Sequence, residues 1–217
     1  STTNPFVVGT LVRMAYEAGA SKVKVMDRGF SGSPEKAYVV SGIQDEVEAA
    51  GGEMVLMSDL KYVPLEIPQG WNIYECRVYQ DILDADVLIN VPVAKTHGLA
   101  KLTLSMKNLM GIIENRPIFH AVLPLHLAHL NSIVKSDLVV VDAVRMMMEN
   151  GPTGGSLDYV KKADTVIASD NVVAADSYGA TLFGMKPLDY PTAKEGAAMG
   201  LGENDLSSVV IEEINLS

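Results

Sequence analysis

Short apolar segments alternate with segments of helical character along this chain, and this alternation constrains its fold more than any other feature. The predicted strands are residues 22–27, 54–57, 86–91, 137–141, 164–168 and 209–214. Helices separated by strands at this spacing are typical of α/β proteins with a parallel sheet. Prolines indicate a small antiparallel excursion at 59–79. We therefore expect a single α/β domain over residues 1–217, with a mostly parallel or mixed sheet flanked by helices.

Composition limits the classes of partner and compartment. The net charge of -10 argues against nucleic acid and against an anionic membrane surface, since both attract a basic face. Cys76 is the single cysteine, which excludes a disulfide and an iron–sulfur cluster held by this chain alone. No apolar run approaches the ~20 residues of a membrane span, and no signal-peptide pattern is present. The sequence thus predicts a cytoplasmic protein.

A reactive triplet follows the predicted strand at 86–91. Lys95, Thr96 and His97 are consecutive, and Gly98 comes next. Ligands of open α/β sheets bind beyond the carboxyl ends of the strands, so these groups are candidates for a site. A lysine offers a point charge or an amine nucleophile, and a histidine offers a proton shuttle or a metal ligand. The alternative is an ordinary surface turn after a strand.

Further candidates lie on predicted helices. Lys107 and Asn108 begin one helix, where they could orient an anionic ligand or simply face solvent. His120 stands at the entrance of another helix and is a candidate for the same pocket. His126 and His129 share a helical face at metal-binding spacing, but the leucines around them favour packing and hydrogen bonding.

A glycine-rich loop follows the predicted strand at 137–141. Residues 150–155 read Asn-Gly-Pro-Thr-Gly-Gly, which is neither a Walker motif nor a dinucleotide-binding fingerprint. Glycines allow backbone amides to approach an anion closely, so Asn150, Gly151, Gly154 and Gly155 could cradle one. A flexible connection is an equally good interpretation.

Carboxylates follow three predicted strands. Asp27, Asp142 and Asp170 would line one rim of a parallel sheet, where they could act as general bases or bind a cation. Asp170 or Asn171 also fits the N-cap of the following helix, and Asp176 fits a structural role inside that helix. Arg28, next to Asp27, is a further candidate for an anion contact.

Six ordered motifs resemble those of the family called domain of unknown function 362. They occupy residues 92–98, 104–111, 120–131, 137–142, 150–155 and 168–176. The resemblance implies a link to iron–sulfur proteins, because many members carry a ferredoxin-like segment with cluster cysteines. That segment is absent here, so the resemblance leaves a ferredoxin-like partner or a homodimer as expectations. Members usually begin with a strand that this sequence lacks, which leads us to expect that an N-terminal strand is missing.

Three functions are compatible with these residues. The first is an enzyme domain that binds a small anionic substrate, with Lys95, His97 and Lys107 as catalytic residues. The second is a metal-linked or iron–sulfur-linked redox accessory protein, in which case a metal ion of unknown identity is the cofactor. The third is a non-catalytic binding module, whose lysines would have ordinary pKa values. The predicted ligand-binding residues are Thr96, Asn108, His120, Asn150, Gly151, Gly154, Gly155, Asp27 and Asp142.

Overall fold

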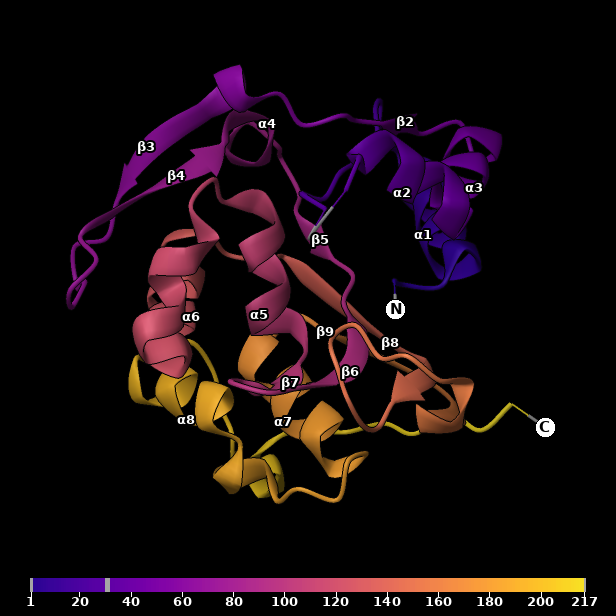
Figure 1. The fold of residues 1–217 in the computed structure, drawn as a ribbon. Coiled ribbons are helices and arrows are strands. Elements are labelled where there is room, and N and C mark those ends of the chain that lie inside the picture. Colours follow the sequence, from indigo (N-terminus) through magenta and orange to yellow (C-terminus); the bar gives the residue numbers. More distant parts are fainter. Residues whose placement is uncertain (1, 30–31, 217) are drawn as a thin grey trace.

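A computed structural model describes residues 2–29 and 32–216, and its centre is a five-stranded mixed sheet (Figure 1). The strands are β5 (Ile89–Asn90), β6 (Val93–His97), β7 (Lys101–Thr103), β8 (Leu138–Met147) and β9 (Val160–Ser169). β5 and β6 run parallel to β8, whereas β7 is antiparallel to β6 and β9 is antiparallel to β8. The mixed α/β fold predicted from the sequence is confirmed.

β5 and β6 form one interrupted strand along a single edge of β8. Ile89 pairs with Leu138 and Val93 with Asp142, so both segments keep the same register. The amide of Asp142 also donates to the carbonyl of Pro92 (2.8 Å), which continues the ladder across the interruption. The register then shifts, because β6 advances two residues where β8 advances five. This bulge bends the sheet where β6 carries the reactive triplet.

Helices cover the sheet on one side (Figure 1). They are α5 (Ser105–Asn108), α6 (Leu123–Ile133), α7 (Val172–Thr181) and α8 (Pro191–Ala198), with the 3₁₀ helices η2 (Leu109–Ile112), η3 (Arg116–Val122), η5 (Pro187–Asp189) and η6 (Leu206–Ser208). A further 3₁₀ helix, η4 (Leu157–Tyr159), belongs to the connection between β8 and β9. The main core lies between this layer and the sheet, where Leu104, Met106, Val141 and Tyr190 are fully or almost fully buried. Burial of apolar side chains on both partners fixes the position of α5 over β8.

The N-terminal residues form a separate layer rather than strands of the central sheet. β1 (Lys24–Val25) and β2 (Glu53–Met54) pair only with each other, in parallel, among the described residues. They pack beneath α1 (Pro5–Glu17), α2 (Pro34–Ser41) and α3 (Ile43–Ala49). α1 begins at Asn4, whose side chain accepts from the amide of Phe6, as the Asn-Pro pair predicts. The sequence therefore identified these elements but not their separation from the main sheet.

The predicted antiparallel excursion is present as a hairpin. After η1 (Asp59–Lys61), β3 (Tyr62–Glu66) pairs with β4 (Glu75–Tyr79), and α4 (Gln80–Leu83) follows. The hairpin packs against η2, η3 and α6 through Ile67, Ile73 and Val78. Figure 1 shows it at the edge of the molecule opposite the C-terminus.

Three sequence-based expectations were wrong in detail. Residues 93–97 form a strand, not a turn, because β8 extends far enough to pair with them. β9 is antiparallel to β8, since residues 148–159 turn the chain directly back instead of crossing over the sheet. Residues 209–214 form no strand, because no described strand pairs with them. Phe30 and Ser31 of the predicted loop lie outside the described residues.

No helix in the part of the chain that the structure describes is long and apolar enough to cross a membrane.

Candidate anion-binding site

Side chains from three segments meet beside the carboxyl end of β6. Lys95 and His97 come from β6, Lys107 comes from α5, and Arg116 comes from η3. Their charges act on one another: Lys95 and Arg116 lower the pKa of Lys107, and Lys107 lowers the pKa of His97. We call Lys95, His97, Lys107, Arg116 and His120 the basic cluster. It unites four of the predicted site residues.

Asp27 is the acidic neighbour of the basic cluster. It follows β1 and is acted on by the charges of Arg116 and Lys95. The hydroxyl of Tyr38 donates to its carbonyl (2.5 Å), and the amide of Arg28 donates to the carbonyl of Gly111 (2.9 Å). A Cβ at Gly111 would lie 2.0 Å from Oδ1 of Asp27, so only glycine allows this close approach. The N-terminal layer thus reaches the site through Asp27.

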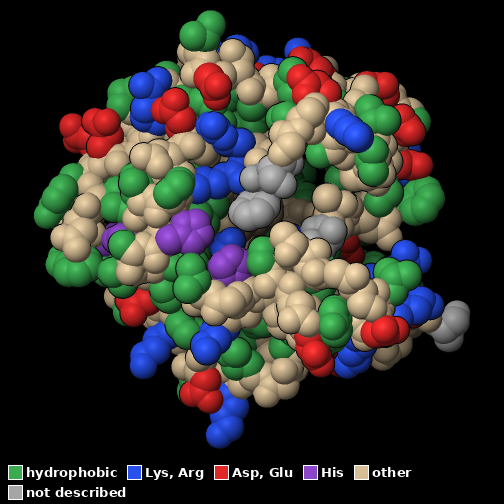
Figure 2. All heavy atoms as spheres, in the orientation of Figure 1, with side chains coloured by type: hydrophobic (Ala, Val, Ile, Leu, Met, Phe, Trp, Pro, Cys, Tyr) green, Lys and Arg blue, Asp and Glu red, His purple; other side chains and the backbone are tan. Residues whose placement is uncertain are grey.

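The carboxyl of Asp27 has a raised pKa. The residue is exposed to solvent, yet the surrounding protein raises its pKa to about 6. Burial is the largest cause, and the charges of Arg116 and Lys95 oppose it. Figure 2 shows lysine, arginine and histidine side chains gathered on one face of the molecule.

Burial lowers the pKa values of Lys95, His97 and Lys107 in the basic cluster. It lowers the pKa of Lys107 to about 8, with smaller effects of Lys95 and Arg116. Burial also lowers the pKa of Lys95, although Asp27 partly restores it. The pKa of His97 falls to about 4 through burial and through Lys107, His120 and Lys95. Two amines that give up protons more readily than usual are common at sites of chemistry.

Two arginines add donors at the edge of the cluster. Arg116 donates from Nη2 to the carbonyl of Arg28, and Arg28 lies over the ring of Tyr62 (5.3 Å) and 3.7 Å from Asp59. Nε of Arg116 and Nη1 of Arg28 are buried without a hydrogen-bond partner among the described residues. Buried donors of this kind favour an acceptor, and the oxygens of an anion would supply one.

The glycine-rich loop packs on β6. Two of its backbone amides do not take part in the predicted anion cradle. The amide of Gly151 donates to Oγ1 of Thr96 (3.1 Å), and the amide of Gly154 donates to the carbonyl of Asn150 (2.9 Å). Both amides therefore already have acceptors within the protein. Asn150 and Gly155 are exposed, and Thr96 serves as the anchor of the loop.

Substitution of Gly151 by alanine is expected to loosen this anchor. A Cβ there would lie 2.0 Å from the carbonyl oxygen of Thr96, which is backbone and cannot rotate away. We expect a loss of roughly 1–3 kcal/mol in the free energy of unfolding, the usual cost of overpacking. Urea denaturation measures it. Gly98→Ala is the control, because its Cβ would meet nothing within 4 Å; equal stability of the two variants would contradict the prediction.

Two predicted ligand-binding residues have structural partners instead. The side-chain amide of Asn108 donates to Oδ1 of Asn90 (2.9 Å), which ties α5 to β5. The carboxylate of Asp142 accepts from the amides of Asn4 (2.6 Å) and Val144 (3.0 Å), which fixes the start of α1 and the bulge in β8. Asp142 also does not stand at a strand end as predicted, because β8 continues beyond it to Met147.

The remaining polar candidates also hold the fold together. Asp176 is buried and accepts from the amides of Ser105 (2.6 Å) and Met106 (3.0 Å), which agrees with its predicted structural role. Asn171, rather than Asp170, caps α7. Both ring nitrogens of His126 lie near carbonyl oxygens, at 3.1 and 3.2 Å, as expected for a packing histidine.

The described residues contain no group of three or more histidine, cysteine, aspartate or glutamate side chains placed to hold a metal ion. Cys76 is buried, and burial raises the pKa of its thiol to about 11.

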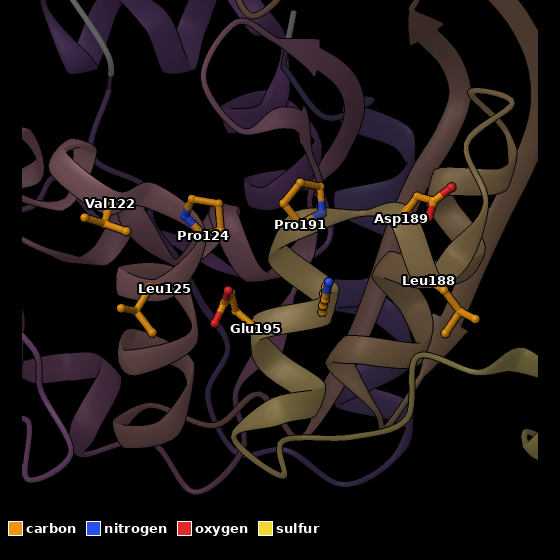
Figure 3. Close-up of a pocket in the computed structure, with 8 residues that line it drawn as sticks. Val122, Pro124, Leu125, Leu188, Asp189, Pro191 and Glu195 are labelled. Atoms are coloured by element: carbon orange, nitrogen blue, oxygen red, sulfur yellow. The ribbon is translucent and has the colours of Figure 1, made fainter.

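A separate cavity of about 410 Å³ lies between α6 and α8 (Figure 3). Val122, Pro124, Leu125 and Pro191 line it together with Glu195, which points toward the cavity from α8. None of its lining residues belongs to the basic cluster. Lys194 also lines it, but the two carboxylates of Asp189 and Glu195 outnumber this single cation, so the basic cluster remains the candidate site for an anion.

Arg116 is the site residue that sequence reasoning missed. It lies 89 residues from Asp27 in the sequence, and η3 has no periodic pattern that reveals which way its side chains point. Gly111 stood at the end of a recognised segment, but its contact with Asp27 depends on tertiary packing alone.

Comparison with known proteins identifies the family to which this chain belongs. The model of the family described as domain of unknown function (DUF362) matches residues 1–181. The chain is also 23% identical over 214 residues to the thylakoid-associated protein sll1697 of Synechocystis sp. (strain ATCC 27184 / PCC 6803 / Kazusa). That similarity covers 92% of this chain and 62% of the relative, so the chain spans less than two thirds of the relative's length. The family match covers most of the sequence and includes every residue of the basic cluster: the protein belongs to the DUF362 family.

Proposed function

We propose that this protein is an enzyme domain that binds a small anionic substrate at the basic cluster. One observation carries the proposal. Lys95, Lys107 and Arg116 come from three different elements and crowd together beside Asp27, although the protein as a whole has a net charge of -10. Mutual repulsion and burial of cations cost free energy, so such a cluster is expected where a bound anion offsets them.

The chemistry of the cluster favours an enzyme over a simple binding module. With a pKa of about 8, the amine of Lys107 is partly unprotonated near neutral pH and can act as a base or a nucleophile. With a pKa of about 6, Asp27 can exchange a proton in the same range. A binding module has no need of lysines with lowered pKa values.

A metal-linked or iron–sulfur-linked role has less support. The described residues lack a three-ligand group, and the thiol of the single cysteine lies in the core. The redox role, the ferredoxin-like partner and the homodimer stay predictions from the sequence.

The pH dependence of anion binding tests the proposal. Sulfate is a suitable probe, because it remains a dianion throughout the neutral and alkaline range. Its affinity is expected to fall as the pH rises through about 8, where Lys107 loses its charge. The affinity is expected to rise as the pH falls through about 6, where Asp27 takes up a proton and loses its negative charge. Each change in sulfate affinity can reach tenfold per pH unit if the bound anion keeps Lys107, or Asp27, protonated.

Isothermal titration at constant ionic strength measures these affinities. Lys107→Met should remove the step near pH 8 and keep the step near pH 6, whereas the exposed Lys101→Met should keep both. An affinity that does not change between pH 5 and 9, or no binding at all, would contradict the proposed site.

A further inference from the structure

Backbone hydrogen bonds fix the tautomer of His97. Its Nδ1 lies 3.1 Å from the amide nitrogens of both Leu99 and Ala100. Both amides can only donate, so Nδ1 must be the nitrogen without a proton. In the neutral ring, the proton therefore resides on Nε2. Burial and the charge of Lys107 keep this ring neutral, since they lower its pKa to about 4.

The opposite tautomer is fixed in His120. Its Nδ1 lies 3.1 Å from the carbonyl oxygen of Arg116, which can only accept. Nδ1 of His120 therefore carries a proton, and Nε2 of the neutral ring offers a lone pair. Within the described residues, Nε2 of neither His97 nor His120 has a hydrogen-bond partner. The charge of His120 acts on His97, so the two rings belong to one site.

This arrangement changes the role predicted for His97. Either acid–base chemistry or metal ligation through Nε2 needs a lone pair there, which would move the proton to Nδ1. A proton on Nδ1 would face two amide hydrogens and break both hydrogen bonds of the turn. His97 is thus a fixed hydrogen-bond donor, and His120 is the histidine that can accept a proton.

We propose that the site recognises a small anion with a hydroxyl group next to its carboxylate or phosphate. Nε2–H of His97 donates to an oxygen of the anion, and Nε2 of His120 accepts the hydrogen of the hydroxyl. Lys95 and Lys107 supply the positive charge. This inference rests on the proposed function and narrows its substrate class. An anion that lacks the hydroxyl leaves Nε2 of the exposed His120 to water, so it forms one hydrogen bond fewer with the protein and binds less tightly.

Matched pairs of ligands test this inference. Malate and succinate differ only in one hydroxyl, and so do propane-1,2-diol 1-phosphate and propyl phosphate. Titration calorimetry of the full chain at pH 7 gives the four dissociation constants. We expect the hydroxylated member of at least one pair to bind about fivefold more tightly, the ratio for one neutral hydrogen bond. The pair that shows the ratio distinguishes a carboxylate from a phosphate.

Asparagine variants separate recognition from folding. In His97→Asn, the side-chain oxygen can still accept from the amides of Leu99 and Ala100, but the Nε2–H donor is lost. In His120→Asn, the side-chain amide can still donate to Arg116, but the Nε2 acceptor is lost. His97→Asn should weaken both members of the preferred pair about equally, whereas His120→Asn should abolish the preference and retain binding of the anion without the hydroxyl.

The outcomes distinguish this inference from the proposed function. Equal binding of both members in both pairs, or a preference that survives in His120→Asn, would overturn the hydroxyl inference while leaving the anion site intact. Failure of all four ligands to bind would count against the proposed function itself. Nitrogen-detected NMR of the histidine rings reports the tautomers without any ligand, and a proton on Nδ1 of His97 would also overturn the inference.

Discussion

Replacing Lys107 by methionine is expected to weaken sulfate binding by roughly 10- to 100-fold at pH 7, the usual value of one charge-assisted hydrogen bond. The same variant is expected to be more stable than the wild type. Its ammonium group is largely buried and is repelled by Lys95 and Arg116. A methionine of similar length removes both penalties, so the free energy of unfolding should rise by roughly 1 kcal/mol or more.

The sign of the stability effect follows from the pKa of Lys107. Its ordinary value is 10.5, and its value in the folded protein is about 8. The folded protein therefore binds this proton less tightly than the unfolded chain, and the wild type gains stability as the pH rises from about 8 to 10.5. Lys107→Met should lack this gain.

Chemical denaturation and calorimetry together check the prediction. Higher stability combined with weaker anion binding is the signature of a residue kept for function. Lys101→Met is the control and should change neither quantity, because Lys101 is exposed. A Lys107→Met variant that unfolds more easily and binds sulfate as before would show that Lys107 has a structural role only.

Replacing Asp176 by alanine is expected to give the largest loss of stability, roughly 3–5 kcal/mol. The carboxyl accepts from the amides of Ser105 and Met106 at the start of α5, and its removal would leave both buried donors unpaired. Because α5 carries Lys107, anion binding should weaken as well. Urea denaturation measures the stability.

Two variants sharpen this test. Ser177→Ala is the neighbouring control, since its buried hydroxyl has no partner among the described residues and its loss should cost little. Asp176→Asn should lie between the wild type and Asp176→Ala, because burial raises the pKa of Asp176 to about 7 and a neutral side chain is thus tolerated. A cost below 1 kcal/mol for Asp176→Ala would contradict the proposed cap.

Local signals predicted the elements well, and tertiary packing decided how they pair. Proline after a capping residue, as in Asn4-Pro5 and Ser33-Pro34, is a local signal for the starts of α1 and α2, because caps act within a few residues. The prolines of residues 59–79 likewise indicated the antiparallel hairpin β3–β4. The separation of β1–β2 and the antiparallel direction of β9 depend on contacts between distant segments, which no local pattern records.

The site was predicted in part for the same reason. Lys95, His97, Lys107 and His120 stood out because reactive side chains followed predicted strands or opened helices. Their convergence with Asp27 was expected from a shared rim, but the structure achieves it through the N-terminal layer and Gly111. Sequence reasoning could not tell that Asn108 and Asp142 are hydrogen-bonded within the fold, since a free and a satisfied polar side chain look identical in a sequence.

The most direct test of the anion site is a crystal soaked in tungstate, a tetrahedral dianion whose metal gives a strong anomalous signal. The structure predicts an anomalous peak beside Asp27, with tungstate oxygens within hydrogen-bond distance of Nζ of Lys107 and of Arg116. The peak should disappear in Lys107→Met crystals grown in the same form. Peaks confined to other surfaces, or an unchanged peak in the variant, would contradict the account.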